Sequence, residues 1–295
     1  MATNLLTKLR DPYIYGILSN HQVIDLLKTF LNIECPIIHT LACNIITIFD
    51  PYPKKICKYT LKRTLNWYSK SISFHGRVFI FNGELNKEFY EYDFNNEALL
   101  SKMNTLISKQ YMGICECEQF IYNIGGWQID PIAECEKYDV LRNQWLPLKK
   151  LNKKRGFNGA FQFNHKWIYA LCGYSKKIVK SIERTNAMKI KRWEIINPSF
   201  REPEFGGSCM LGIQIEGSKC LLFGGSENYK EITDSFVMDI DENGGCGIYR
   251  NGMLRYGGRF INSAPMIYKD RIYAIDDSGH FHVYDIKVNK WVLWT

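Results

Sequence analysis

The stretch QFIYNIGGWQIDPIAECEKYDVLRNQW, residues 119–145, places a short apolar run, a double glycine, a tyrosine and a tryptophan in one order. The apolar run at 120–124 is too short for a helix, and its Ile, Phe and Tyr residues predict a strand that is buried on both faces. Gly125 and Gly126 follow at once, then Tyr138, and Trp145 comes seven residues later. One such stretch would indicate little, whereas a repeated one would decide the architecture.

The apolar run recurs along the chain at residues 45–49, 78–81, 120–124, 167–171, 220–223 and 271–275. The copies are spaced by about 33 to 52 residues, which fits one four-stranded propeller blade per copy. In most copies the strand after the run carries an aromatic residue and an acid, and SIERTNA at 181–187 is the deviant copy. The residues that we assign to this structural repeat are Gly125, Gly126, Tyr138, Trp145, Gly173, Trp193, Gly224, Gly225, Tyr284 and Trp291.

This order of apolar run, glycine pair, tyrosine and tryptophan resembles the kelch repeat over roughly residues 35–295. The resemblance implies an all-β fold, a six-bladed kelch-type β-propeller with four-stranded antiparallel blades. In that fold the apolar run is the second strand of its blade, next to the innermost one. A glycine at its end would relieve crowding between blades, and the tyrosine and tryptophan would wedge between neighbouring sheets.

Residues 1–34 lie outside the repeat and predict a short N-terminal helical segment. In SNHQVIDLLKTFLN, residues 19–32, the apolar residues fall on one helical stripe. We expect this helix to pack against the propeller near its closure, and docking into a partner or dimerisation is the alternative. The segment leaves no room for a broad-complex/BACK-type module, so the architecture of a full-length ubiquitin-ligase adaptor is not expected.

Composition narrows the class of protein. The 295 residues are 46% apolar and 14% aromatic, enough for a large core, and no run of about 18 apolar residues could span a membrane. The ten cysteines stand singly, mostly in apolar runs, which predicts reduced, buried thiols such as Cys43, Cys172, Cys209 and Cys220. We therefore expect a cytoplasmic protein, with association to the cytoskeleton or a cilium as a further possibility.

Basic residues gather in two loops that the propeller topology places on one face. The predicted partner-binding residues are Lys149, Lys150, Lys153, Lys154, Arg155, Lys176, Lys177 and Lys180. Together with the formal charge of +8, they favour a protein partner with an acidic surface or segment. Nucleic acid is disfavoured because no base-stacking motif accompanies the charge. A solvated basic loop without a specific ligand is the plain alternative.

Signals for catalysis or metal binding are weak. Cys115 and Cys117 alternate on one strand, and His280 and His282 stand close to Asp276. Core thiols and packing or surface histidines are the preferred interpretations, because two ligands make half a zinc site. Motifs for nucleophilic catalysis are absent, so no catalytic residue and no cofactor are expected. The chain is predicted to be a non-catalytic interaction module, the alternatives being a substrate-recognition subunit of a ubiquitin ligase and a kelch-fold sugar-modifying enzyme.

Overall fold

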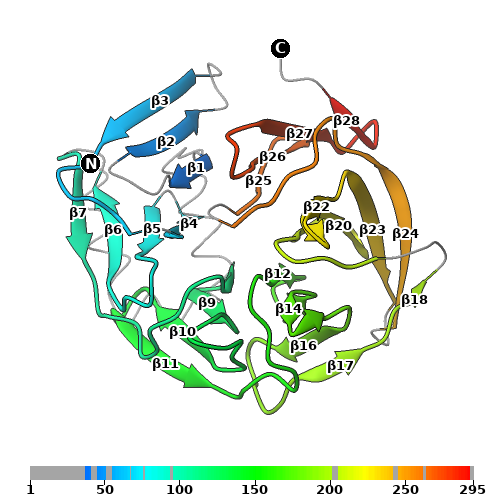
Figure 1. Cartoon of the computed structure of the whole chain (residues 1–295), viewed down its shortest axis with the longest axis horizontal. Helices are drawn as coiled ribbons and strands as arrows, with labels where there is room; N and C mark the ends of the chain where they lie inside the picture. The colour runs from blue at the N-terminus through cyan, green and yellow to red at the C-terminus, as the bar shows by residue number, and fades with distance from the viewer. Residues whose placement is uncertain are drawn as a thin grey trace, which may run out of the picture.

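A ring of antiparallel sheets forms the body of the protein (Figure 1). The computed structural model describes residues 37–40, 45–50, 55–66, 68–75, 77–93, 96–200, 205–241, 245–261 and 264–292. Strands β4, β8, β12 and β25 lie near the central axis, and β7, β11, β17, β24 and β28 lie at the rim (Figure 1). The architecture is therefore a β-propeller, and the described residues contain no helix.

Each sheet takes its strands from one continuous part of the chain. The first sheet contains β1 (Ile37–Thr40), β2 (Ile45–Asp50) and β3 (Lys55–Thr60). The next contains β4 (Lys70–Phe74), β5 (Arg77–Phe81), β6 (Phe89–Asp93) and β7 (Ala98–Ser101). It is followed by the sheet of β8 (Gly113–Cys117), β9 (Phe120–Ile124), β10 (Cys135–Asp139) and β11 (Gln144–Leu148).

The second half of the ring repeats this plan with two additions. One sheet contains β12 (Gly159–Phe163), β13 (Trp167–Leu171), β16 (Ile182–Asn186) and β17 (Glu194–Ile196). The five-stranded sheet contains β19 (Leu211–Glu216), β20 (Lys219–Phe223), β23 (Asp234–Ile240) and β24 (Cys246–Met253), with β18 (Ser199–Phe200) parallel to β24. The last contains β25 (Met266–Tyr268), β26 (Arg271–Ile275), β27 (Phe281–Asp285) and β28 (Lys290–Val292). Two small hairpins stand apart, β14 (Tyr174–Ser175) with β15 (Lys177–Ile178) and β21 (Ser226–Glu227) with β22 (Lys230–Glu231).

The predicted count of six four-stranded blades is wrong, because in the described part of the chain five sheets have four strands or more and the first has three. The described residues that follow β3, 61–66, form no fourth strand. Instead, Leu61 and Leu65 are buried against Val78 and Tyr90 of the next blade. Burying two leucines there favours an irregular path over pairing with β3. The predicted N-terminal helix and the domain boundary at residue 34 lie outside the described residues.

The apolar runs have the expected place in their blades. In each of the five blades the run is the second strand, which is β5, β9, β13, β20 or β26. Each is buried along nearly its whole length, because it is covered by neighbouring blades on both faces. Cys172, Cys209 and Cys220 are buried free thiols, whereas Cys43 lies outside the described residues. No helix of the described part of the chain has the length and apolarity needed to cross a membrane.

The glycine pairs lie where one blade meets the next. Gly125 has a φ of +59°, and a β-carbon there would lie 2.7 Å from the carbonyl oxygen of Arg155 in the following blade. The N–H of Gly126 donates to that same oxygen at 2.8 Å. The equivalent bonds at the next two junctions run from Gly173 to Gly207 at 3.3 Å and from Gly225 to Gly258 at 2.7 Å. The glycines thus permit a main-chain latch between blades.

The repeat tryptophans bond to residues outside their own strand pair. The indole N–H of Trp145 donates to the carbonyl oxygen of Met103 at 2.8 Å, and Trp145 packs against Phe89 of the preceding blade. Trp193 makes the same bond to Lys149 at 2.8 Å, and Trp291 donates to the Ser235 hydroxyl at 2.9 Å. Each ring is therefore an apolar wedge with a satisfied polar tip. Tyr138 and Tyr284 are buried beside these indoles.

Candidate functional site

The loops that could recognise a partner emerge on one face of the ring, which we call the loop face. Inter-blade loops lead from the outermost strand of one blade to the innermost strand of the next, and mid-blade loops join the second and third strands. In three consecutive blades the two kinds of loop are joined by paired main-chain hydrogen bonds of 2.8–3.0 Å: Gln110 with Trp127, Gly156 with Tyr174, and Ser208 with Ser226. This pairing gives the loop face a defined shape.

The structure brings the predicted basic loops together. Inter-blade loop 149–158 and mid-blade loop 172–181 are joined through Gly156 and Tyr174. Six lysines on these loops are exposed and form what we call the basic patch: Lys149, Lys150, Lys153, Lys154, Lys176 and Lys177. Lys150 is paired with Glu134 at 2.7 Å, and the half-buried Lys180 with Glu227 at 3.5 Å.

Arg155 does not belong to this surface, which corrects its assignment as a partner-binding residue. Its side chain is 0% exposed. The guanidinium donates to Glu183 at 2.7 Å and to the carbonyl oxygens of Cys172 and Ser181 at 3.0 and 2.7 Å. A buried guanidinium with these partners fixes the two loops to each other and is unavailable to another protein.

The same buried pair occurs one blade earlier. Lys109 stands four residues before the innermost strand, as Arg155 does, and its ammonium lies 3.7 Å from the carboxylate of Glu136. Burial lowers the pKa of Lys109 and raises the pKa of Glu136, and each charge opposes the shift of the other. Glu136 and Glu183 occupy equivalent positions in the third strand, so SIERTNA conforms to the repeat at its acid.

A series of half-exposed aromatic rings lies beside the basic patch. We call it the aromatic rim, and it consists of Tyr68, Tyr111, Phe157, Trp127 and Tyr174. The closest pair is Tyr111 and Phe157, whose ring centroids are 3.9 Å apart. Sequence patterns gave no sign of this series, because its members come from five different loops of three blades.

The rim residues of the inter-blade loops have an unusual backbone. Tyr68, Tyr111, Phe157 and Cys209 occupy equivalent positions, and their φ angles lie between 52° and 63°. Bulky residues rarely adopt positive φ, at a cost of about 1 kcal/mol or more each. Main-chain bonds join three of them: the N–H of Phe157 donates to the carbonyl oxygen of Tyr111 at 2.7 Å, and that of Cys209 to the carbonyl oxygen of Phe157 at 2.6 Å. A chain of backbone hydrogen bonds therefore links three consecutive blades on the loop face.

A buried polar group lies near the central axis of the ring. The buried ammonium of Lys70 donates to the carbonyl oxygen of Met112 at 3.1 Å. Burial lowers the pKa of Lys70 to about 8, although the nearby Cys209 and Asp277 favour its charged form. Lys70 and Cys209 belong to blades that are not neighbours, so this interaction connects opposite parts of the ring. Burial also raises the pKa of Cys209 to about 12, so its thiol is a poor nucleophile at neutral pH.

The predicted candidates around Asp276 do come together. The Asp276 carboxylate lies 3.0 Å from His280 Nδ1 and 2.9 Å from His282 Nε2 through one oxygen. Its other oxygen accepts the main-chain N–H groups of Ser278 and His280, both at 2.9 Å. All of these contacts lie within one mid-blade loop and the strand after it. The carboxylate is thus occupied in holding the mid-blade loop of the last blade, at the position that Asn82, Gly125, Cys172 and Gly224 occupy in the four preceding blades.

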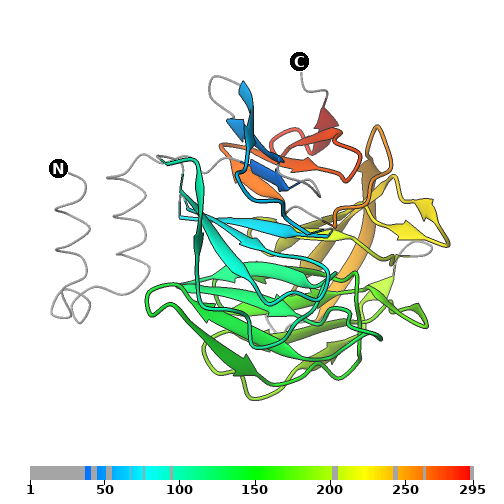
Figure 2. The ribbon, with the colours of Figure 1, turned by 60° about the vertical axis from the view of Figure 1, so that its left-hand side comes forward.

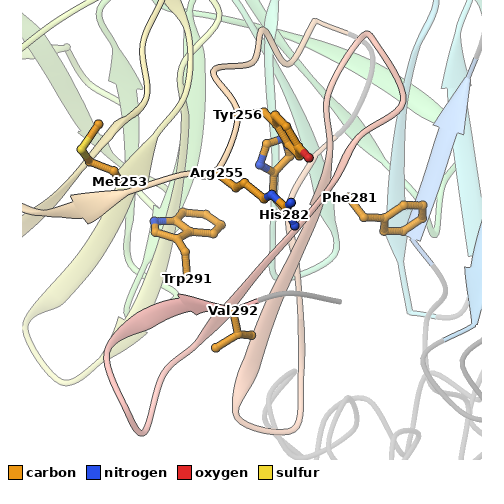
Figure 3. A pocket seen from close by; sticks show the side chains of 7 residues that line it. All are labelled: Met253, Arg255, Tyr256, Phe281, His282, Trp291 and Val292. Carbon is orange, nitrogen blue, oxygen red and sulfur yellow. The ribbon is translucent and has the colours of Figure 1, made fainter. Parts of the chain in front are cut away.

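A pocket of about 360 Å³ opens between the last two blades (Figure 3). Its lining is Met253, Arg255, Tyr256, Phe281, His282, Trp291 and Val292. The Tyr256 ring stacks on His280, with centroids 4.8 Å apart. His282 also packs against Trp291. The lining is mainly apolar and aromatic, with one exposed arginine as its charged group.

Cys115 and Cys117, the other candidate metal ligands, are core residues. Cys115 and Cys117 are buried in a core cluster with Tyr122 and Cys135, and burial raises the pKa of both thiols, that of Cys117 to about 12. Within the described ranges, no group of three or more His, Cys, Asp or Glu side chains could hold a metal ion.

Comparison with known proteins gives partial matches, and no family model matches the chain. The RING finger domain and kelch repeat-containing protein of Dictyostelium discoideum is 26% identical over 122 residues, which is 41% of this chain and 12% of that protein. Kelch-like protein 23 of Mus musculus is 30% identical over 118 residues, or 39% of this chain and 20% of the relative. Kelch-like protein 23 of Pongo abelii is 26% identical over 147 residues, or 48% and 25%. The matched regions thus span a quarter or less of each relative.

Proposed function

We propose that this chain, which is a kelch-repeat β-propeller, is a non-catalytic subunit of a larger cytoplasmic assembly and binds other proteins through its loop face. Function on a propeller resides in its loops, because the blades are occupied by the scaffold. The partner contributes an acidic surface or segment.

The basic patch is the observation that carries this proposal. Six exposed lysines lie on two loops that are hydrogen-bonded to each other. Among the described residues, the structure gives an acidic partner to Lys150 alone of the six. Clustered unpaired cations of this kind accelerate encounter with an acidic protein and select against basic ones.

The aromatic rim adds apolar contact area beside this charge. Tyrosine and tryptophan are enriched among the hot-spot residues of protein interfaces, because they bury a large area and lose little rotamer entropy on binding. A main-chain hydrogen bond fixes Phe157 and Tyr111 to each other, so the backbone that carries these two rings is in place before a partner arrives. An acidic segment with apolar side chains could therefore contact lysines and rings together.

The test removes charge from the patch without touching the buried Arg155. The variant K153Q/K154Q/K176Q/K177Q lowers the net charge by four, and its matched control K166Q/K189Q/K191Q/K219Q does the same on the opposite face, where these exposed lysines lie. Affinity purification with quantitative mass spectrometry would compare the proteins recovered with each. We expect specific partners to be depleted at least about tenfold in the patch variant.

Equal depletion of partners in both variants would show that net charge, and not the basic patch, determines binding, and would contradict the proposal. Equal recovery of every partner in the patch variant and the natural chain would contradict the proposal.

A substrate-recognition subunit of a ubiquitin ligase is the second candidate. One relative that matches this chain carries a RING finger domain with its kelch repeats, as its name states. A ligase scaffold or RING protein among the partners, recovered equally with the patch variant, would support this candidate. A sugar-modifying enzyme gains less support, because the Asp276 carboxylate is occupied within its own loop.

A further inference from the structure

The hairpin of β21 and β22 displays a tyrosine in a conformation that tyrosine disfavours. Its two-residue turn is Asn228-Tyr229, between the pairs Ser226–Glu231 and Glu227–Lys230. Both turn residues have positive φ, 48° and 64°, as in a type I′ turn. Glycine is strongly preferred at the second position of this turn, because a side chain there crowds the backbone.

The side chain of Tyr229 is fully exposed and so adds no packing to the fold. The relative exposure of Tyr229 is 104%, the highest among the large apolar residues that are exposed. Figure 2 shows the hairpin (yellow) standing out from the ring. A residue that strains its turn and packs against nothing in its own fold is explained by a contact with another molecule.

The surroundings of the hairpin specify the chemistry of that contact. Glu227 is paired with Lys180 at 3.5 Å, which ties the hairpin to the loop of the basic patch. Lys230 is exposed next to the tyrosine, and Glu231 is the exposed acid on the same strand. An aromatic ring at the tip of a turn can be buried only by a concave surface, since a flat surface or a passing peptide covers one side of it.

We propose that Tyr229 is an anchor that inserts into an apolar pocket of a folded partner protein, with carboxylates at the pocket edge that faces the basic patch. This inference rests on the proposed function and makes it more specific, because the propeller supplies the projecting part and the partner supplies the cavity.

The first part of the test needs no partner. Three variants of the full chain separate strain from contact: Tyr229→Gly removes both ring and strain, Tyr229→Ala removes the ring and keeps the strain, and Tyr229→Phe keeps both. We expect Tyr229→Gly to raise the Tm by about 1–3 °C, since Asn-Gly is the favoured pair for this turn. Tyr229→Ala and Tyr229→Phe should leave the Tm within about 1 °C. A lower Tm for Tyr229→Gly would show that the tyrosine serves the fold and would overturn the proposal.

The second part identifies what covers the ring. The photoreactive residue p-benzoylphenylalanine replaces Tyr229 in the full chain, and the control carries it at Leu141, an exposed apolar residue on the opposite face. Mass spectrometry then maps the cross-linked residue of the partner. The proposal is supported when position 229 but not 141 cross-links to a folded domain, at an apolar pocket with carboxylates at its edge.

Affinity for that purified partner completes the test. We expect Tyr229→Gly and Tyr229→Ala to weaken binding at least about tenfold, and Tyr229→Phe to stay within about threefold. Cross-links to an unfolded segment, to a second copy of this chain or to no protein would overturn the proposal, as would unchanged affinity of Tyr229→Gly. Loss of binding in the four-lysine variant with full binding by Tyr229→Gly would reject the anchor and keep the proposed function. The reverse result would keep the anchor and reject the acidic partner.

Discussion

Gly125 shows how one residue joins two blades. Its positive φ and the carbonyl oxygen of Arg155 leave no space for a β-carbon, while the next residue donates its N–H to that oxygen. We predict that Gly125→Ala destabilises the protein by about 2 kcal/mol or more, because both strain and a close contact oppose it. The Gly279→Ala control has positive φ but open space around it, so it isolates the strain. Denaturant unfolding would measure both, and equal losses would contradict the role of the close contact.

Arg155 and Lys154 are neighbours with opposite roles. Removing the buried guanidinium leaves the Glu183 carboxylate without its cationic partner, although hydrogen bonds from Asn152 and Lys153 remain, and breaking a buried pair of this kind costs about 3–5 kcal/mol. We therefore expect Arg155→Met to lower the free energy of unfolding by that amount, and Lys154→Met, at an exposed lysine, to change it by less than about 0.5 kcal/mol. A mild effect of Arg155→Met in urea unfolding would show that the pair contributes little.

Lys70 gives the fold a pH dependence in the alkaline range. The native pKa of about 8 lies below the ordinary 10.5, so the unfolded chain holds this proton more tightly. Below pH 8 the charge is buried and the penalty is complete, about 3 kcal/mol in order of magnitude. Between pH 8 and 10.5 the native chain releases the proton first, and the penalty disappears. We predict that the Tm of the natural chain rises relative to the Tm of the Lys70→Met variant as pH is raised from 7 to 10. A constant gap would contradict the lowered pKa.

At the scale of elements, the last blade shows how one buried carboxylate holds a mid-blade loop in place. Burial opposes the charge on Asp276, but hydrogen bonds from His282 and from His280 hold the pKa of its carboxyl below the usual 3.8. A depressed carboxyl pKa stabilises the fold above the unfolded value and loses this effect as pH falls through the native value. We predict that Asp276→Asn destabilises the protein at pH 6 and that the difference from the natural chain narrows below about pH 4. Thermal unfolding across pH 3–6 would measure it, with Asp270→Asn, an exposed aspartate of the same blade, as control.

The elements were predictable where their cause is local. Short runs of Ile, Val, Phe and Tyr decide the second strand of every blade, and the glycine after β9 marks its end. The irregular path of residues 61–66 was not predictable, because it depends on the burial of Leu61 and Leu65 against a neighbouring blade, which is a tertiary contact. Lysine-rich loops predicted the basic patch, but Arg155 has the same sequence signature as its exposed neighbours. Tyr111, Phe157 and Tyr229 escaped prediction because their positive φ arises from loop geometry that no residue pattern encodes.

At the scale of the whole molecule, the relevant feature is the position of the positive charge. The chain carries a formal charge of +8, and the basic patch concentrates positive charge on the loop face. Electrostatic attraction acts mainly on the association rate and is screened by salt over about 10 Å at 0.1 M. We predict that raising NaCl from about 50 to about 500 mM slows association with an acidic partner at least about tenfold and changes dissociation little. Surface plasmon resonance would measure both rates.

The matched lysine variants sharpen this test. The patch variant should lose most of its salt dependence, while the opposite-face control should keep it. If the association rate of both variants depended on salt to the same extent, the attraction would arise from net charge and not from the basic patch.

The chain of backbone hydrogen bonds through Tyr111, Phe157 and Cys209 has an evolutionary consequence. Where Tyr111, Phe157 and Cys209 meet, the blades hold one another through peptide groups, which every residue type possesses except for the N–H that proline lacks. Side chains at these positions can therefore diverge between descendants of one gene while the ring stays closed. Duplicated copies could acquire new binding preferences by point mutation on the loop face, long before any change in architecture.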